Sequence, residues 1–472
     1  MRTALVWFRR DLRLADNPAL VAACDTHASI LPVYIHDPGG NESWPSGAAS
    51  RWWLHHSLAS LHGELLGRQG SLHLRDGDTL QILQDLIHRS GARAVYWNRL
   101  YEPQTLASDS RLEGALRDHG IEVHTYNASL WSEPWRITNR QGEPYRVFTP
   151  YWRTLRAQLD PAPHPAEPPA PRWVELPGSL PLATLDLLPR IPWDGGLAES
   201  WRPGESGASK ALRAFCDGAL SDYAQGRDYP ARHGTSRLSP HLHFGEISPR
   251  QIQRALVDHS QRVDGRRRPD MEPYLRALGW REFAHHLLYH FPQTPTDNFN
   301  ARFDGFPWRA TDEALITRWQ RGRTGIPLVD AGMRELWHTG WMHNRVRMVV
   351  ASFLTKNLLQ HWHHGAHWFW DTLVDADLAN NTLGWQWVAG CGADAAPYFR
   401  VFNPVTQART YDPLGQYVKR WVPELAHLPL GMLHEPWKHS AGSAAGYPAP
   451  ITDLSESRER ALAAYRQRFG AA

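Results

Sequence analysis

The 472-residue sequence predicts an α/β N-terminal domain followed by an all-α C-terminal domain. Near the start, short apolar runs alternate with amphipathic segments, as in a parallel sheet covered by helices on both faces. From about residue 205 onward, apolar residues recur at helical spacing and strand-like runs almost vanish. Residues 160–204 between them are rich in proline, which interrupts helices and central strands. We therefore predict an α/β domain over residues 1–130, an interdomain linker over 131–204 and a helical domain over 205–472.

Five apolar runs are the candidate strands of a parallel, doubly wound sheet. They are Ala4–Phe8, Ile30–Ile35, Leu72–Leu74, Ala94–Trp97 and Glu122–Tyr126. Helical patterns intervene at Ala49–Leu66 and Thr79–Arg89. The turn after the first run reads FRRDLRL, so the glycine fingerprint of ordinary dinucleotide-binding proteins is missing there.

The C-terminal domain shows seven amphipathic segments at a period near 3.6 residues. They cover Ala208–Leu220, Pro249–Asp258, Met271–Tyr289, Thr311–Arg321, Leu328–Thr339, Asn344–Leu358 and His364–Leu373. Helix start signals support two of them, because Ser248 precedes Pro249 and Thr311 precedes two acidic residues.

Composition excludes several classes of protein. No run of 18 apolar residues is present, so we expect no membrane span. The N-terminus enters a strand directly and lacks the apolar core of a signal peptide. The three cysteines, Cys24, Cys216 and Cys391, are too far apart for a disulfide framework or a zinc set, and they fit the reducing cytoplasm. We expect a cytoplasmic protein and a monomer.

Charge gives no general signal for nucleic-acid binding, because the net charge is only +3. Arginines do cluster locally, at Arg262 and 266–268 and again at Arg318, Arg321 and Arg323. Such clusters form either a solvated loop or a surface that faces phosphates.

Tryptophan is unusually abundant, with 23 residues against 15 tyrosines and 14 phenylalanines. Some of these large rings must fill a core. The others suit stacking against bases or a flat cofactor, or electron transfer.

Five segments of the helical domain carry polar or aromatic residues in patterns that suggest a ligand site. The hydroxyl-rich loop from Arg227 to Ser239 suits a diphosphate, although ordinary turns have a similar composition. The segments GWREF at 279–283 and WMHNRVRM at 341–348 place Arg and Asn on helices, where they serve either an internal ion-pair network or a ligand. The segment VDADLANN at 374–381 adds two carboxylates, and GWQWVAG at 384–390 adds two tryptophans.

Metal binding is an alternative interpretation of the acidic segment 374–381 and of a cluster of histidines. The acidic segment has Ala379 where a calcium loop needs glycine. The histidines at 361, 363, 364 and 367 lack Cys or carboxylate partners at ligand spacing. We therefore expect no metal site.

In this order, the motifs resemble the photolyase/cryptochrome family along nearly the whole chain. They are VWFRRDLRLADN, GTSRLSP, HFGEISPR, GWREF, TGIPLVDAGMREL, GWMHNRVRM, VDADLANN, GWQWVAG and DAAPYFRVFNP. Within the family, the sequence is most similar to the bacterial class I photolyases that repair cyclobutane pyrimidine dimers.

The resemblance implies that FAD, active as FADH⁻, binds in the helical domain. The positions that match the family's FAD contacts are Tyr223, Thr235, Ser236, Leu238, Ser239, Arg281, Asn344, Arg347, Asp375, Asp377 and Asn381. Asn381 matches the amide of photolyases, where plant cryptochromes carry Asp. This match favours an electron-donating flavin over a signalling one.

The resemblance also implies a DNA-repair pocket and an electron path. UV-damaged DNA is the expected partner, and positions matching its contacts are Arg227, Ala277, Trp280, Asn344, Arg345, Met348, Trp387 and Arg400. Trp280 and Trp387 would stack on a flipped-out dimer. The residues Trp308, Trp362 and Trp385 match the tryptophans that carry an electron to FAD. Asn344 and Met348 stand where photolyases specific for (6-4) products carry His, which argues against that substrate.

The sequence departs from the class I pattern in the repair pocket. Ala277 stands where class I photolyases carry a Glu that contacts the dimer, and Tyr274 stands where many relatives carry Trp. A lost charged hydrogen bond costs about 1.5–3 kcal/mol, or about 10- to 150-fold in the affected step. A blue-light receptor with weak or no repair activity is therefore the alternative.

An antenna, methenyltetrahydrofolate or a deazaflavin, is compatible with the N-terminal domain, but no residue is assigned to it.

Overall fold

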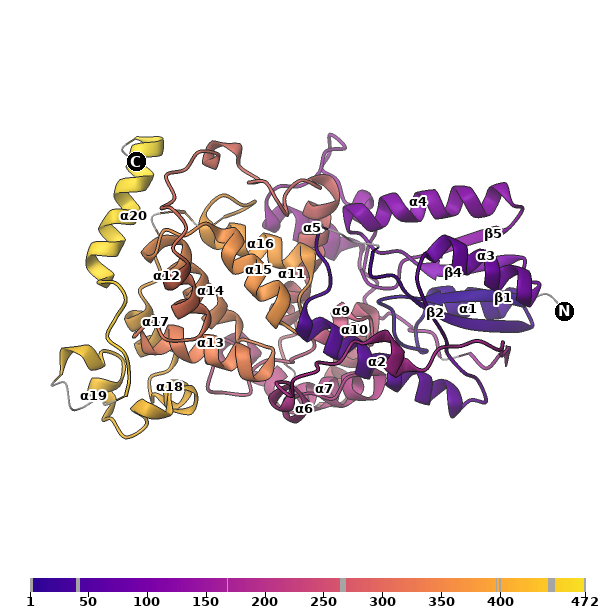
Figure 1. Ribbon diagram of the computed structural model, residues 1–472, viewed down its shortest axis with the longest axis horizontal. Helices are drawn as coiled ribbons and strands as arrows, with labels where there is room; N and C mark the ends of the chain where they lie inside the picture. The colour runs from indigo at the N-terminus through magenta and orange to yellow at the C-terminus, as the bar shows by residue number, and fades with distance from the viewer. Residues whose placement is uncertain are drawn as a thin grey trace.

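The structure is a computed structural model that describes residues 3–39, 43–167, 169–263, 269–395, 397–398, 400–439 and 446–470. Figure 1 shows a sheet-containing part at one end and a helical part that extends to the C-terminus at the other. Arg266–Arg268 of the predicted arginine cluster lie outside the described residues. Among the described helices, none is long and apolar enough to cross a membrane.

The predicted parallel sheet is confirmed. Its strands are β1 (Thr3–Phe8), β2 (Ser29–His36), β3 (His73–Asp76), β4 (Ala94–Asn98) and β5 (Glu122–Tyr126). They follow the order β3-β2-β1-β4-β5, and every pair is parallel. All but one residue of β1 and of β2 are buried, which explains their continuous apolar runs.

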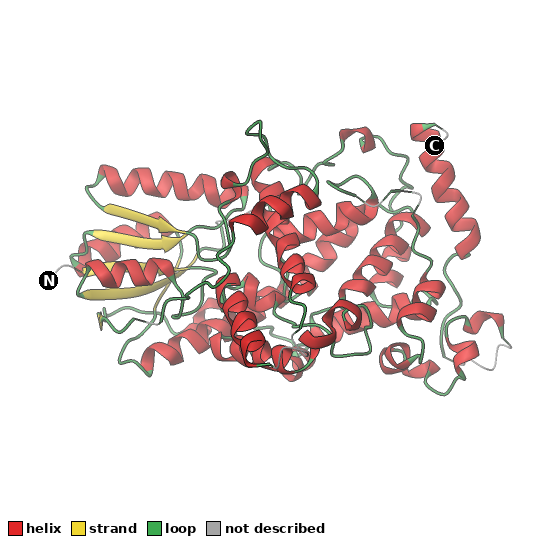
Figure 2. Cartoon of the chain, turned by 180° about the vertical axis from the view of Figure 1, so that it is seen from behind, coloured by secondary structure: helices red, strands yellow, loops and turns green. Residues whose placement is uncertain are grey.

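Helices cover both faces of this sheet (Figure 2). They are α1 (Pro18–Thr26), α2 (Ala48–Leu66), α3 (Thr79–Ser90) and α4 (Pro103–Asp118). The sequence patterns predicted α2 and α3 to within one residue, but not α1 and α4. Both unpredicted helices begin with proline, and the side chain of Asn17 caps α1 by accepting from the N–H of Leu20 at 3.2 Å.

The segment between the two parts is more structured than its proline content suggests. It contains α5 (Phe148–Gln158), the two-residue strand β6 (Arg172–Trp173) and α6 (Gly195–Ser200). β6 pairs in parallel with β2 and adds a sixth strand to the sheet. α5 packs against a helix of the C-terminal part, so the segment contributes to the cores of both. The domain limits at residues 130 and 205 stay a prediction.

The C-terminal part is helical, as predicted. Its helices are α7 (Glu205–Asp217), α8 (Tyr223–Gly226), α9 (Ser239–His243), α10 (Pro249–Arg262), α11 (Glu272–His290), α12 (Glu313–Gln320), α13 (Pro327–Thr339), α14 (Asn344–Ser352), α15 (Trp362–Thr372), α16 (Leu378–Ala389), α17 (Pro404–Tyr411), α18 (Gln416–Trp421), α19 (Leu430–Leu433) and α20 (Leu454–Phe469). Short 3₁₀ turns lie at Pro134–Arg136, Leu182–Leu185, Ala219–Asp222, Ala301–Phe303, Pro423–Leu425 and Pro436–Lys438.

The helix predicted over Asn344–Leu358 changes character part-way. The α-helix ends at Ser352 and a π-helical turn follows over Phe353–Asn357. Insertions of this kind are rare and are often found at functional sites.

The two parts are joined by buried polar contacts from the VWFRRDLRLADN motif. The guanidinium of Arg13 is fully buried and donates to the carbonyls of Gly245 at 2.8 Å and Ala128 at 2.9 Å. The carboxylate of Asp16 accepts from Ser248 Oγ at 2.5 Å and Arg250 Nε at 3.1 Å. The turn after β1, which lacks the glycine fingerprint of dinucleotide-binding proteins, thus connects the two parts.

Candidate flavin and DNA site

The hydroxyl-rich loop is held against α11. Gly234 has no room for a side chain, because a Cβ there would lie 2.3 Å from the carbonyl of Gly226. Ser236 Oγ accepts from the buried Tyr274 hydroxyl at 2.9 Å, and Leu238 is fully buried beside it. The side chains of Thr235 and Ser236 stay half-buried. The hydrogen bond from Tyr274 therefore fixes the loop, while Thr235 and Ser236 remain partly accessible.

An ion pair connects the loop to the polar residues of α14. Arg347 donates from Nη2 to both carboxylate oxygens of Asp375, at 2.9 and 3.1 Å, and from Nε to the carbonyl of Met342 at 2.7 Å. Ser239 Oγ donates to Asp375 at 2.6 Å. The side chain of Asn344, at the first position of α14, is exposed. Arg347, Asp375 and Ser239, all of them predicted FAD contacts, thus form one network of hydrogen bonds.

Asp377 is the second buried carboxylate of the site. His285 Nε2 lies 3.4 Å and His243 Nδ1 lies 3.5 Å from its Oδ2. Burial raises the pKa of Asp377, but the charges and hydrogen bonds of His285 and His243 outweigh it and hold the pKa well below its usual range. The other nitrogen of His285 lies 2.9 Å from the carbonyl of Arg281. Both ring nitrogens of His285 thus lie close to oxygen atoms, one of Asp377 and one of the Arg281 backbone.

The remaining predicted FAD residues lie around this centre. Arg281 donates to the carbonyl of Ser129 at 2.7 Å, which ties α11 to the N-terminal part. Asn381 donates its amide to the carbonyl of Ala366 at 3.0 Å, so its amide oxygen is the group left for a ligand. Tyr223 is buried and packs edge-on against Tyr274 at 5.0 Å.

Arg237 is the strongest sign that this site takes an anionic ligand. It lies in the loop between two predicted FAD contacts and adopts a positive φ of 52°. Its guanidinium carbon lies 4.1 Å from the ring centre of Trp201 and 5.2 Å from that of Trp341. Among the described residues it makes no ion pair, and its Nε is buried without a hydrogen-bond partner. Burial lowers the pKa of Arg237, and the nearby carboxylates of Glu335 and Asp375 offset this effect only in part. A half-buried cation whose Nε is buried without a partner fits the diphosphate of FAD.

The predicted repair pocket is built from α11, α14 and α16. Trp280 is half-buried, and one face of its ring stacks on Phe148 with 3.7 Å between the ring centres and 10° between the planes. Trp387 is also half-buried, on α16, which packs against α11. Ala277 is half-buried in the same apolar cluster as Trp280. Phe148 thus supports the ring that is expected to stack on the substrate.

Three of the predicted DNA contacts are arginines. Arg345 makes an ion pair with Asp228 at 2.7 Å and covers the ring of Tyr411 at 4.3 Å. Arg227 is half-buried with its guanidinium 5.3 Å from the ring of Tyr223. Arg400 is exposed, and the side chain of Met348 is half-buried on α14.

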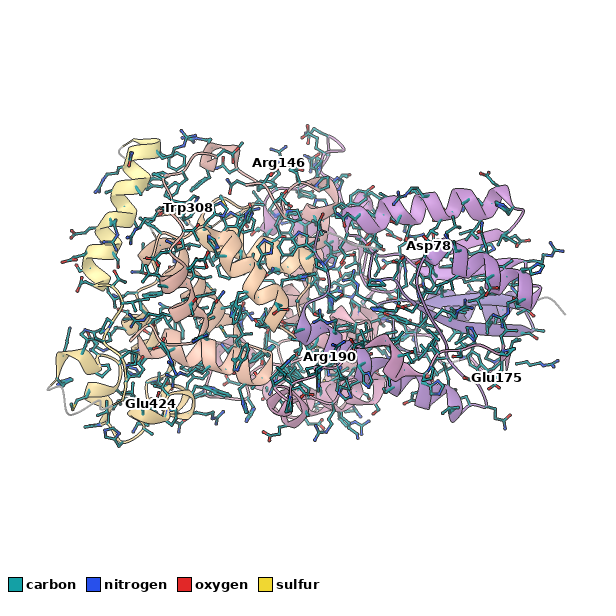
Figure 3. All side chains as sticks on the ribbon, viewed as in Figure 1. Asp78, Arg146, Glu175, Arg190, Trp308 and Glu424 are labelled. Carbon is teal, nitrogen blue, oxygen red and sulfur yellow. The ribbon has the colours of Figure 1, made fainter. Side chains whose placement is uncertain are left out.

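Two tryptophans of the predicted electron path are buried and the third is half-buried. Trp385 is 3% and Trp362 is 1% exposed, whereas Trp308 is half-buried. The ring of His361 lies between Trp308 and Trp362, at 5.4 and 5.6 Å. A Cβ on Gly365 would lie 1.9 Å from Trp385, so glycine lets α15 approach that ring. Trp308, labelled in Figure 3, lies in the half of the molecule far from the sheet.

The histidine-rich start of α15 forms no metal centre among the residues that the structure describes. No group of three or more His, Cys, Asp or Glu side chains in those residues is arranged to hold an ion. The rings pack on aromatic neighbours instead: His361 lies 4.4 Å from His363, and His367 stacks on Trp44 at 4.6 Å.

Comparison with known proteins agrees with this geometry. Residues 4–171 match the family described as DNA photolyase, and residues 274–467 match the FAD binding domain of DNA photolyase. A deoxyribodipyrimidine photo-lyase of Agrobacterium fabrum is 48% identical, over 98% of this chain and 97% of its own length. The chain belongs to the photolyase/cryptochrome family. Arabidopsis thaliana cryptochrome-2 is 38% identical, over 97% of this chain and 78% of its own length.

A solved photolyase shares the whole fold. The crystal structure of a bacterial class III photolyase from Agrobacterium tumefaciens matches with a TM-score of 0.94 and 46% identity, covering 100% of this chain and 98% of its own. The helical part of this photolyase-family chain is therefore an FAD-binding domain. The sequence resemblance to class I, in contrast, stays a prediction, because this relative is described as class III.

Three residues of the site were missed by sequence reasoning. Arg237 lies within the quoted motif GTSRLSP, and its charge beside three hydroxyl groups was an available signal. His285 lies four residues after Arg281, so helical spacing was a signal for a shared face. Phe148 lies in the segment interpreted as a linker, and nothing local indicated its contact with Trp280.

Proposed function

We propose that this protein repairs cyclobutane pyrimidine dimers in DNA with light, by electron transfer from excited reduced FAD to a flipped-out dimer. The Arg237 cation without an ion-pair partner, close to Asp375 of the Arg347–Asp375 pair, carries the proposal. It offers an anion site next to residues 274–467, which match an FAD binding domain. The name of the relative from Agrobacterium fabrum, a deoxyribodipyrimidine photo-lyase, supports the choice of substrate.

The chain's own residues would divide the work as follows. When bound, FADH⁻ supplies an electron to the dimer under light and receives it back after the dimer has split. Thr235, Ser236 and Arg237 would hold the diphosphate. Asp375, Asp377 and Asn381 would orient the ribose and the ring edge. Trp280 and Trp387 would exclude water from the dimer by stacking on it, which is worth about 1–3 kcal/mol per base.

Tryptophans would return the oxidised cofactor to its active form. Trp385, Trp362 and Trp308 lead from the buried core to the half-buried periphery, the direction that delivery from an external reductant requires. An antenna chromophore, a cytoplasmic location and a monomeric state remain predictions. The three cysteines are free in the structure.

A blue-light receptor without repair activity is the second candidate, and Ala277 favours it. This position lies one helical turn before Trp280 and offers no carboxylate to a dimer. The 38% identity to a plant cryptochrome, over nearly the whole of this chain, fits such a role.

The two candidates are separated by a repair assay on a thymine-dimer oligonucleotide, in light and in darkness, with wild type, Ala277→Glu and the neutral control Ala277→Gln. We expect wild type to repair in light only, and Ala277→Glu to be faster by up to about 10- to 150-fold. Equal rates for wild type and Ala277→Glu would show that the carboxylate is not needed here. If neither variant nor wild type repairs although each binds FAD, the protein is a receptor.

A further inference from the structure

The backbone around Arg400 is fastened to the π-helical turn that follows α14. We call Pro397, Tyr398 and residues 400–402 the Arg400 segment. The N–H of Arg400 closes a turn onto the carbonyl of Pro397 at 2.9 Å, and the N–H of Phe402 donates to Ser352 Oγ at 3.2 Å. The ring of Tyr398 stacks on Tyr465 at 5.0 Å and packs against Phe306 at 5.1 Å. The exposed guanidinium of Arg400 is thus carried on a fixed backbone.

Lys356 makes the third attachment. Its Nζ donates to the carbonyl of Arg400 at 3.0 Å and lies 5.1 Å from the ring centre of Tyr398. The side chain is fully buried, within the π-helical turn Phe353–Asn357. Among the described residues, Lys356 makes no ion pair with a carboxylate.

A buried lysine without a carboxylate partner lowers the stability of the fold. We therefore expect Lys356 to have a function besides packing. Burial and the neighbouring Arg400 charge lower the pKa of Lys356 to about 7. Burying an ammonium group costs several kcal/mol unless it is paired, so an apolar residue would serve packing alone better. The π-helical turn also departs from the regular α-helix at the residue that reaches Arg400. The buried Lys356 and the π-helical turn together hold the Arg400 backbone in one position.

We propose that Lys356 is a positioning residue for DNA binding, which holds the Arg400 segment so that the Arg400 guanidinium meets a DNA phosphate. This inference rests on the proposed function, because it assumes that the surface beside the repair pocket binds DNA. Lys356 itself is buried and touches no DNA. Its contribution passes through the carbonyl of Arg400.

The test measures the affinity of FAD-loaded protein for a labelled duplex with one thymine dimer, in darkness and at several salt concentrations. Arg400→Ala should weaken binding about tenfold and reduce the slope of log affinity against log salt by about 0.9, because one phosphate contact is lost. Lys356→Met should reproduce both effects. The double variant should bind no more weakly than Arg400→Ala, because both changes remove the same contact.

Two further variants separate positioning from charge and from misfolding. Lys356→Gln keeps a donor for the Arg400 carbonyl and should recover part of the affinity, even if Lys356→Met proves poorly folded. Lys210→Met removes the same charge from an exposed site on α7 and should bind like wild type. Flavin absorbance and the thermal midpoint report on folding of each variant.

The proposal is overturned if Lys356→Met and Lys356→Gln both bind with the wild-type affinity and salt slope, or if the Lys356 and Arg400 effects multiply. It is also overturned if Arg400→Ala has no effect. A wild-type protein that fails to bind the damaged duplex would overturn the proposed function as well, and this outcome is distinct from the others.

Discussion

At the scale of single residues, the site is defined by charges whose partners come from distant parts of the chain. Asp377 and His285 are 92 positions apart, and Arg347 and Asp375 are 28 apart. The family resemblance identified Asp377, Arg347 and Asp375. No local pattern predicted the contacts of His285, because they depend on what its two ring nitrogens face in the folded chain.

Arg237 gives the first prediction at this scale. Arg237→Met should weaken FAD binding by about 10- to 150-fold, because a charge-assisted hydrogen bond to the diphosphate is lost. The dissociation constant, measured by quenching of flavin fluorescence, checks it. Arg237→Lys should lose less, and Arg213→Met, an exposed cation on α7, should lose nothing. An unchanged affinity in Arg237→Met would show that the half-buried cation does not meet the diphosphate.

Glu335 gives a second prediction, on stability against pH. Burial raises its pKa from 4.5 to about 7, although Tyr417 and the N–H of His343 donate to it. The folded protein therefore keeps a proton that the unfolded chain loses, so the Glu335 contribution to stability falls as pH rises from about 4.5 through 7. We expect the thermal midpoint of Glu335→Gln, relative to wild type, to increase over this range. A difference that is constant between pH 5 and pH 8 would contradict this account.

At the scale of elements, helix packing depends on glycines that sequence patterns do not explain. A Cβ on Gly279 would lie 2.4 Å from the ring of Trp152, so α5 and α11 approach each other only at a glycine. We expect Gly279→Ala to destabilise the protein by about 1–3 kcal/mol and to slow repair, because Trp280 is the next residue. Thermal unfolding and the repair rate are the measurements.

Gly384 supplies the matched control. It lies within α16, and no atom lies within 4 Å of a Cβ placed there. Gly384→Ala should therefore leave the packing intact and raise stability by up to about 1 kcal/mol through helix propensity. If both substitutions destabilise equally, the close approach at Gly279 is not the cause.

Element prediction succeeded where one pattern ran uninterrupted, and failed where tertiary contacts decided. The buried strands and the helices α2, α3, α7, α10, α11, α12, α13 and α15 were recognised from periodicity, whereas α16 and α20 were not. α5 was missed because proline-rich neighbours suggested a linker, whereas its aromatic face packs on α11. The change from α-helix to π-helical turn after Ser352 was also missed. Lys356 in this turn bonds to the carbonyl of Arg400, 44 residues away, and a contact at that separation leaves no local sequence signal.

At the scale of the whole molecule, the FAD-binding part depends on the sheet-containing part for its shape. Arg281 on α11 donates to the Ser129 carbonyl, and Glu282 accepts from the N–H groups of Trp131 and Ser132 at 3.0 and 3.4 Å. The fold class followed from the order of strand and helix patterns. The packing of the two parts did not, since it rests on single buried polar contacts that leave no periodic signal.

The central claim is that light absorbed by reduced FAD in this chain drives dimer repair. The most direct measurement is the rate at which anaerobically reduced protein restores a thymine-dimer oligonucleotide, recorded as a function of wavelength and in darkness. The account predicts no repair in darkness and a rate in light that follows the absorption of the reduced flavin. Repair in darkness, or FAD-loaded reduced protein that binds the oligonucleotide and leaves it unrepaired at every wavelength, would contradict it.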